Sequence, residues 1–175
     1  LREPLLLTSP NGEIMRLRGQ IDRVDVSEDG KLVAYDYKTS RGASINDMRA
    51  GRDVQMAIYL EALERLFCRE EQEVIGGGYY SLRPGSDRRN NGLYRADFSA
   101  YTGLGRTASN LSDDDWQATR KQLINYVWRY WHHLRDGDFR VRPAQNELTC
   151  QYCDYKAVCR FDRYRIQKKK KVSRQ

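Results

Sequence analysis

Two stretches near the start of the chain alternate between apolar and polar residues, and a polar turn separates them. Residues 15–26 (MRLRGQIDRVDV) and 31–39 (KLVAYDYKT) show the two-residue period of β-strands, and SEDG at 27–30 supplies turn residues. We therefore predict a β-hairpin whose loop consists of Glu28, Asp29 and Gly30. Gly30 would take the left-handed conformation that the last position of such a three-residue loop requires.

The predicted register places charged residues on the face of the hairpin that also carries its apolar side chains. Val24 pairs with Ala34, and two residues further along each strand Asp22 lies opposite Asp36, with Lys38 following on the same face. Like charges that face each other destabilise a sheet, and a desolvated carboxylate without a partner costs several kcal/mol. The spacing alone fits two interpretations. The carboxylates bind a divalent cation such as Mg²⁺, or the strand frays and exposes a cluster of ion pairs.

An apolar periodicity of helical type follows, from about Asn46 to Phe67, with Met48, Ile58, Leu63 and Leu66 on its apolar side. Gln55 and Tyr59 lie four residues apart and so share a face of this helix. A glutamine and a tyrosine one turn apart can reach a phosphate or a ligand water together, although a tyrosine on an amphipathic helix is more often a packing residue. Their presence favours the metal interpretation of the carboxylates.

Three short segments occur in a fixed order on strand, strand and helix: GQID at 19–22, DYK at 36–38 and QMAIY at 55–59. Together they resemble the RecB-like branch of the PD-(D/E)XK nucleases, many of which have glutamate where Asp36 stands here. The resemblance implies an α/β fold with a mixed central β-sheet flanked by helices. It also implies roles for six residues: metal binding by Asp22, Asp36 and the carbonyl of Tyr37, catalysis by Lys38, and DNA engagement with active-site support by Gln55 and Tyr59.

Over residues 15–162 the chain is most similar to nuclease domains of the AddB type, which it matches in LRGQIDRVD, YDYKTS, QMAIYLEAL and CQYCDYKAVCRFD. This resemblance implies a cytoplasmic exonuclease that uses Mg²⁺ or Mn²⁺ to hydrolyse a single DNA strand. An AddA-type helicase partner would deliver that strand during double-strand-break repair and recombination. Two alternatives stay open: a stand-alone RecB-like exonuclease resembling the CRISPR-adaptation nucleases, and a non-catalytic DNA-binding scaffold module. The chain has no Walker-type glycine loop, so any ATPase activity belongs elsewhere.

Cys150, Cys153 and Cys159 form a C-x₂-C-x₅-C group near the end of the chain. Thiolate clusters hold zinc or iron–sulfur centres, usually with four ligands. AddB-type and CRISPR-adaptation nucleases carry a [4Fe–4S] cluster whose last three cysteines are grouped in this way, with the first ligand upstream of the nuclease core. No cysteine precedes Asp22 and the chain starts with leucine, so we expect a segment of a longer protein with the fourth ligand further upstream. We interpret Cys68 as an ordinary half-buried residue near a helix end.

The remaining patterns predict one more strand and one more helix. VIGGGYYSL at 74–82 indicates a strand, and the exposed loop after it contains Arg83, Arg88 and Arg89, which either follow a DNA backbone or are only solvated. A helix with an acidic first turn is predicted from 112 to about 134, ending at Gly137. Its apolar stripe is expected in the core: Trp116, Leu123, Val127, Tyr130, Trp131 and Leu134. We interpret His132 and His133 on this helix as structural or surface residues.

Composition and charge narrow the class of protein less than the motifs do. With 175 residues, 39% hydrophobic and 31% charged, the chain is globular rather than disordered or collagenous. No apolar run approaches the roughly 20 residues of a membrane span. The net charge of +7 suggests nucleic-acid binding, but residues 160–175 hold eight basic and one acidic side chain and so account for the whole excess. We predict a nuclease domain at 1–162 and a basic tail at 163–175, which either touches phosphates non-specifically or is simply solvated.

Overall fold

The structure of the protein is a computed structural model that describes residues 3–85, 91–105, 107–140, 150 and 153–155. The chain divides into two compact units, residues 1–132 and 133–175. Within the described residues, the second unit contains the last turn of a long helix and the turn that follows it. No helix among the described residues is both long enough and apolar enough to cross a membrane.

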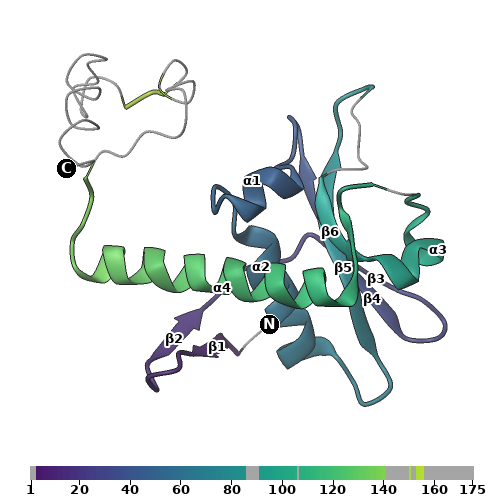
Figure 1. Cartoon of the computed structure of the whole chain (residues 1–175), viewed down its shortest axis with the longest axis horizontal. Coiled ribbons are helices and arrows are strands. Elements are labelled where there is room, and N and C mark those ends of the chain that lie inside the picture. Colours follow the sequence, from purple (N-terminus) through teal and green to yellow (C-terminus); the bar gives the residue numbers. More distant parts are fainter. Residues whose placement is uncertain (1–2, 86–90, 106, 141–149, 151–152, 156–175) are drawn as a thin grey trace. The chain divides into compact units, whose positions relative to one another are not determined.

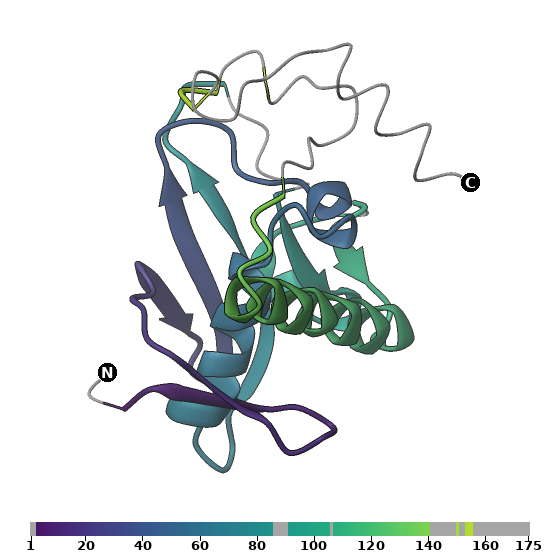
Figure 2. The same ribbon diagram turned by 90° about the vertical axis from the view of Figure 1, so that its left-hand side faces the viewer.

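A mixed five-stranded sheet forms the centre of the first unit, with the strand order β3-β4-β5-β6-β7 (Figure 1). Its strands are β3 (Arg23–Val26), β4 (Lys31–Lys38), β5 (Glu73–Ser81), β6 (Gly92–Arg95) and β7 (Asn110–Leu111). β4 and β5 pair in parallel, and Figure 2 shows their arrowheads pointing the same way, so both strands end on the same side of the sheet. The prediction of an α/β fold with a mixed central sheet is confirmed.

The β3–β4 hairpin has the predicted register. Val24 pairs with Ala34, and Arg23 pairs with Tyr35. Gly30 has a φ of +81°, and the amide of Ser27 donates a hydrogen bond to the carbonyl of Lys31 across the loop. Local turn chemistry and two-residue alternation were therefore sufficient to predict this pairing.

The first predicted strand, residues 15–26, is wrong in its extent. Of the strands in this stretch, only β3 belongs to the central sheet. β2 (Ile14–Leu17) pairs instead with β1 (Leu5–Thr8) in a separate two-stranded sheet. Residues 18–22, between β2 and β3, lie in no strand. Alternation continues through this connection because Ile21 still packs against the core, so the pattern reports burial rather than strand pairing.

The helix predicted from 46 to 67 is interrupted. α1 (Ile45–Arg49) ends before Gly51, which has a φ of +70°, and α2 (Gln55–Ala62) continues into the π-helical turn η1 (Leu63–Phe67). A Cβ atom at Gly51 would lie only 2.7 Å from the ring of Tyr126, so both the backbone conformation and the space require glycine. The two helices bury apolar side chains in the same core, which is why the periodicity did not reveal the break.

Helices cover one face of the central sheet (Figure 1). Side chains from β4–β7, α1, α2, η1 and α4 (Asp113–Arg135) share one core there, with Ala34, Met48, Met56, Leu60, Leu63, Leu93, Leu111, Trp116 and Leu123 among its buried members. The β1–β2 hairpin packs against the same helices through a second cluster in which Leu7 and Met15 contact side chains of α2 and α4. These contacts hold α2 between the hairpin and the sheet.

The opposite face of the sheet is covered by the short elements η2 (Ala96–Phe98) and α3 (Ser99–Thr102), which lie beside β3 and β4 in Figure 1. Val33, Ile75 and Tyr94 form a small buried cluster there. The glycines of β5 make room for it, because a Cβ at Gly76 would lie 2.3 Å from the ring of Tyr94 and a Cβ at Gly78 only 2.0 Å from its hydroxyl oxygen. The expectation of a close approach at these glycines is confirmed, and the strand itself is found one residue earlier than predicted.

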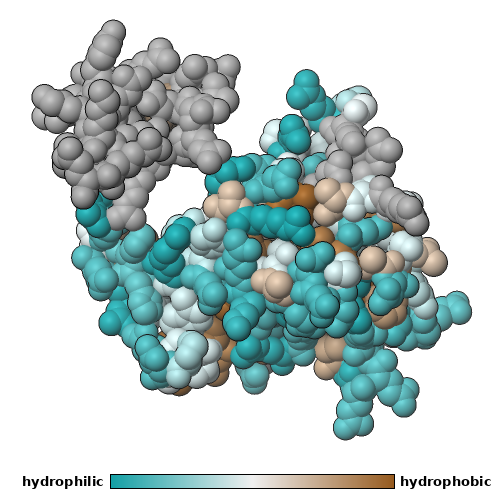
Figure 3. All heavy atoms as spheres, in the orientation of Figure 1, coloured by the Kyte–Doolittle hydropathy of each residue, from teal (hydrophilic) through white to brown (hydrophobic). Residues whose placement is uncertain are grey.

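The long helix α4 follows its prediction closely. It begins at Asp113 with an acidic first turn, ends at Arg135, and is followed by Gly137 with a φ of +65°. Trp116, Leu123 and Val127 are buried as expected, whereas Leu134 is exposed and its assignment to the core is wrong. Figure 3 shows mainly hydrophilic residues over α4 in this view, as an amphipathic helix on the surface requires.

Candidate active site

Asp36 lies near the end of β4, and only 6% of its side chain is exposed. Its Oδ1 atom accepts a hydrogen bond from Gln55 Nε2 at 2.8 Å and lies 3.1 Å from the hydroxyl of Tyr59. Its Oδ2 atom is buried and forms no hydrogen bond of normal geometry with any described residue, although Lys38 Nζ is 2.5 Å away. The ammonium of Lys38 therefore offsets the charge of this oxygen, and a carboxylate oxygen has a second lone pair that can bind a further ligand.

The side-chain amide of Gln55 bridges the two charged groups. Its Oε1 atom accepts a hydrogen bond from Lys38 Nζ at 3.1 Å, while its Nε2 atom donates to Asp36. The carbonyl end of the amide thus faces the ammonium and the NH₂ end faces the carboxylate, which is the favourable orientation for both charges. Lys38 is also held against an aromatic face, with Nζ 5.0 Å from the ring centroid of Tyr79.

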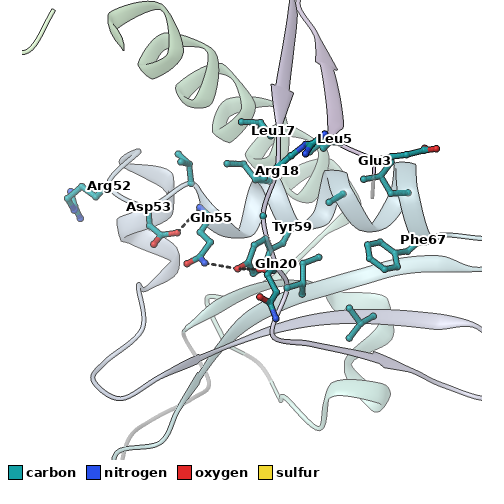
Figure 4. A pocket seen from close by; sticks show the side chains of 17 residues that line it. Glu3, Leu5, Leu17, Arg18, Gln20, Arg52, Asp53, Gln55, Tyr59 and Phe67 are labelled. Carbon is teal, nitrogen blue, oxygen red and sulfur yellow. Dashed lines mark hydrogen bonds between the residues drawn. The ribbon is translucent and has the colours of Figure 1, made fainter. Parts of the chain in front are cut away.

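Tyr59 lies one turn after Gln55 on α2, and the two side chains touch as predicted. Gln55 Nε2 donates to the Tyr59 hydroxyl at 2.8 Å, and that hydroxyl lies 2.8 Å from the carbonyl oxygen of Gln20 (Figure 4). Burial raises the pKa of Tyr59 to about 12; the hydrogen bond from Gln55 opposes this shift and the negative charge of Asp36 adds to it. The phenol is therefore neutral at physiological pH and can donate a hydrogen bond either to Gln20 or to Asp36.

Asp22 reaches the same end of the sheet by a different route from the one predicted. β3 starts at Arg23, so Asp22 does not pair with Asp36 in the ladder, and that part of the predicted register is wrong. Instead, Asp22 Oδ2 accepts a hydrogen bond from the amide of Tyr37 at 2.9 Å. The exposed carboxylate of Asp22 is thereby fixed to the residue that follows Asp36, while Asp36 itself is buried rather than part of an exposed ion-pair cluster.

Two further side chains, which sequence reasoning missed, complete the surroundings of Lys38 and Gln55. Tyr79 pairs with Asp36 in the parallel ladder, and its hydroxyl donates to Asp53 Oδ1 at 2.6 Å. The same Asp53 oxygen accepts the backbone amide of Gln55 at 3.2 Å, at the start of α2. Burial and the charge of Asp53 raise the pKa of Tyr79, so this phenol is also neutral. Alternation within VIGGGYYSL is the signal that would have placed Tyr79 on the Asp36 face.

A cavity of about 670 Å³ lies beside α2 and is lined mainly by apolar side chains of β1, β2, α2 and η1 (Figure 4). Polar and charged side chains also line it: Glu3, Arg18, Gln20, Arg52, Asp53, Gln55 and Tyr59. Gln55 and Tyr59 therefore contact Asp36 and the cavity at the same time.

The predicted DNA-contacting arginines are only partly described. Arg83 lies just beyond the end of β5 and is exposed. Arg88 and Arg89 lie outside the described residues. Of the two histidines, both half-buried, His132 lies 3.1 Å from Glu13 Oε2 and packs against the ring of Trp131, in line with the structural role expected for it.

The cysteines are likewise divided. Cys150 and Cys153 are half-buried, and Cys159 lies outside the described residues. Cys68 Sγ donates to the carbonyl of Gln72 at 3.0 Å and burial raises its pKa, which fits the ordinary half-buried residue expected at a helix end. Within the part of the chain that the structure describes, no three His, Cys, Asp or Glu side chains are grouped as a metal site.

The oxygen atoms at the end of β4 nevertheless suit one kind of metal ion. Mg²⁺ is commonly held by one or two carboxylates, while water and substrate phosphate complete its octahedral shell. The buried Oδ2 of Asp36, the exposed carboxylate of Asp22 and the carbonyl of Tyr37 are hard oxygen ligands of this type. The chemistry of this donor set therefore fits Mg²⁺ or Mn²⁺.

Comparisons with known proteins point in the same direction. A family model described as the PD-(D/E)XK nuclease superfamily matches residues 3–160. An ATP-dependent helicase/deoxyribonuclease subunit from Clostridioides difficile, of the AddB type, is 22% identical over 210 aligned positions, which cover 91% of this chain and 18% of the relative. The proteins of the same description from Alkaliphilus metalliredigens and Acetivibrio thermocellus are each 25% identical over 207 positions with the same coverage.

The chain spans about 18% of the length of these curated relatives. Their description agrees with the AddB-type resemblance that the motifs predicted, and the family match covers both the sheet and α2. The chain belongs to the PD-(D/E)XK nuclease superfamily.

Proposed function

We propose that this chain is the nuclease domain of an AddAB-type helicase–nuclease and that it hydrolyses DNA phosphodiester bonds with Mg²⁺ or Mn²⁺. Family membership and the description of the relatives support this proposal. The observation that carries it is the setting of Asp36, a buried carboxylate with one oxygen held by α2 and the other facing the ammonium of Lys38. A carboxylate and an ammonium that are held together in a largely buried position and oriented by a glutamine and a tyrosine are typical of a reactive site rather than of a surface ion pair.

Asp22 and three residues at the end of β4 would together bind the cation and assist hydrolysis. When bound, a divalent cation lowers the pKa of water and polarises the phosphate. Asp36, Asp22 and the carbonyl of Tyr37 would hold the cation. Lys38, whose ammonium lies beside Asp36, would orient the attacking water and stabilise the negative charge that develops on the phosphate.

Gln55 and Tyr59 would act as positioning residues. Both contact Asp36 Oδ1, and Gln55 also accepts a hydrogen bond from Lys38, so together they fix the carboxylate and the ammonium relative to each other. Partners that orient metal ligands typically contribute 10–100-fold to metal affinity or activity. In addition, their position on the wall of the cavity puts them within reach of a bound DNA strand.

The substrate would be a single DNA strand degraded from its end, delivered by an AddA-type helicase partner during the repair of double-strand breaks. The words helicase and deoxyribonuclease in the relatives' description motivate this proposal. Arg83, Arg88 and Arg89, which follow β5 in the sequence, are the candidates for contacts with the DNA backbone.

The grouped cysteines suggest a structural iron–sulfur centre. Cys150, Cys153 and Cys159 would supply three of the four ligands of a [4Fe–4S] cluster. Iron and acid-labile sulfide bound to anaerobically purified full-length protein, and lost together in a Cys153→Ser variant, would support this ligand set.

The proposed activity is tested with end-labelled single-stranded DNA in Mg²⁺ or Mn²⁺. We expect metal-dependent cleavage by the wild type and a loss of roughly a thousandfold, about 4 kcal/mol of transition-state stabilisation, in Asp36→Asn. Asp114→Asn is the matched control, because Asp114 is an exposed carboxylate in the first turn of α4 and belongs to neither proposed site. This control should cleave like the wild type.

Undiminished cleavage by Asp36→Asn would show that the active site lies elsewhere. If the wild type shows neither cleavage nor Mn²⁺ binding that depends on Asp36, the chain is better explained as a non-catalytic DNA-binding module. Calorimetric titration with Mn²⁺ alone separates these outcomes, since it does not require turnover.

A further inference from the structure

The two faces of β4 carry different chemistry at the same end of the strand. Asp36 and Lys38 point to the face covered by α2, while the alternation of the strand turns Tyr35 and Tyr37 to the opposite face. Tyr37 is 39% exposed although it lies between two candidate active-site residues. Its Cα atom is about 3.8 Å from those of Asp36 and Lys38, so the side chain of Tyr37 starts next to the candidate active site.

Tyr37 belongs to an aromatic surface shared by β3, β4 and β5. Its ring packs edge-on against that of Tyr80, with centroids 5.6 Å apart, and its hydroxyl accepts a hydrogen bond from Arg23 at 3.3 Å. The guanidinium of Arg23 also lies 5.6 Å from the ring centroid of Tyr35. These residues form a partly exposed tyrosine surface, which we define as Tyr35, Tyr37, Tyr80 and Arg23; Tyr37 and Arg23 are exposed, and Tyr35 and Tyr80 are half-buried.

A small cavity of about 220 Å³ opens within this surface. Six of the residues that line it are Arg23, Asp25, Tyr35, Tyr80, Tyr94 and Leu104. It is smaller than the roughly 300 Å³ at which pockets for drug-sized ligands begin, so it suits a single flat ring system. Asp25 adds a carboxylate that can accept hydrogen bonds from a ring amine, although it is already paired with Arg23 at 2.6 Å.

Two arginines follow the strands that end beside the candidate active site and the tyrosine surface. β4 and β5 are parallel, so the segments that follow them leave the sheet on the same side. Arg41 follows β4 and Arg83 follows β5, and both side chains are exposed. Guanidinium groups that follow these strands, together with the rings of the tyrosine surface, match the chemistry of an unpaired nucleic-acid strand, which presents phosphates and bases together.

We propose that the tyrosine surface binds an unpaired base of the DNA strand whose neighbouring phosphate is cleaved on the other face of β4. This inference rests on the proposed function. The strand crosses the end of β4 and β5, its phosphates contact Arg41 and Arg83, and the base stacks on Tyr37 and Tyr80. The surface thereby selects for single-stranded DNA, because a base held in a duplex cannot reach the rings.

The test measures binding without cleavage, so its result does not depend on hydrolysis. The probes are a fluorescein-labelled single-stranded oligonucleotide and the same oligonucleotide with abasic sites, both in EDTA. We expect Tyr37→Leu and Tyr80→Leu each to weaken binding of the intact oligonucleotide about tenfold, the effect of losing one stacked base. The abasic oligonucleotide should bind the wild type and both variants equally weakly.

Two control variants isolate the aromatic contact. Tyr37→Phe keeps the ring and should retain wild-type affinity, which would show that the ring rather than the hydroxyl makes the contact. Tyr101→Leu removes another exposed tyrosine, which is bound to Asp29 in the loop at the opposite end of β4, and should also bind normally.

Wild-type affinity of Tyr37→Leu and Tyr80→Leu for the intact oligonucleotide would overturn the proposal. So would an equal loss on the abasic oligonucleotide, because the tyrosines would then contact the backbone rather than a base. Stacking-dependent binding together with an absence of cleavage would reject the nuclease function but leave this binding surface standing.

Discussion

β4 carries a lysine at each end, and the two lysines lie in contrasting surroundings. At the first end, Lys31 Nζ is 2.9 Å from Glu73, Glu73 also pairs with Arg95, and Arg95 lies 3.2 Å from Asp113. Positive and negative groups alternate along this chain of contacts. At the other end, Lys38 Nζ lies 2.5 Å from a carboxylate oxygen of Asp36, whose side chain is buried.

The contrast separates partly exposed charges, which stabilise the fold a little, from a charge pair whose carboxylate is buried. In the Lys31 network each charged group faces an opposite charge and lies partly in water, so it adds a little stability. Around Lys38 the carboxylate of Asp36 is almost wholly buried, with one oxygen facing the ammonium and the other held by the glutamine and tyrosine of α2. A buried charge held in this way is costly to the fold, which is the situation expected of a site kept for chemistry.

The largest difference between the two ends of β4 is expected when each lysine is replaced with methionine. We expect Lys38→Met to lower metal-dependent cleavage by about a hundredfold or more, because it removes the cation beside the phosphate. Lys31→Met, on the same strand, should cleave at the wild-type rate. Equal rates for the two variants in a single-turnover assay would show that Lys38 is as structural as Lys31.

A second variant tests whether Gln55 of α2 positions the metal ligand. Gln55→Ala removes the amide that joins Asp36 to Lys38 and should reduce cleavage by about 10–100-fold, with a matching loss of Mn²⁺ affinity. Gln72→Ala is a glutamine control at the turn before β5. If Mn²⁺ titration shows unchanged affinity in Gln55→Ala, the glutamine does not position the metal ligand.

The smallest effect is expected at the Lys31 end. Glu73→Gln should lower the free energy of unfolding by about 1 kcal/mol at neutral pH, the upper range for partly exposed ion pairs, without changing the cleavage rate. The hydrogen bond from Lys31, followed by that from Arg95, lowers the pKa of Glu73 below its ordinary value of 4.5. Its contribution is therefore complete above pH 4.5 and is lost as the pH falls through the lowered pKa.

Urea denaturation at several pH values checks this linkage. The difference between the wild type and Glu73→Gln should shrink below pH 4.5, because the protonated glutamate resembles glutamine. A difference that persists unchanged at pH values well below the lowered pKa would mean that the ion pairs do not stabilise this end of the sheet.

Local patterns in the sequence were enough for the parts of the fold that depend on neighbouring residues. Alternation and Gly30 determined the β3–β4 pairing, apolar spacing and Gly137 determined α4, and the four-residue spacing determined that Gln55 and Tyr59 meet. The same patterns identified the charged residues at the end of β4, since few sequences place charges on a core-facing strand.

Only the tertiary structure decided which groups complete the site. Asp22 reaches the site through the backbone of Tyr37, and Tyr79 and Asp53 join from segments far apart in the sequence. Gly51 breaks the predicted helix because the ring of Tyr126 lies against it, and residues 14–17 pair with β1 rather than extending β3. Periodicity records which side of a segment is buried, but the partner that buries it is set by long-range packing.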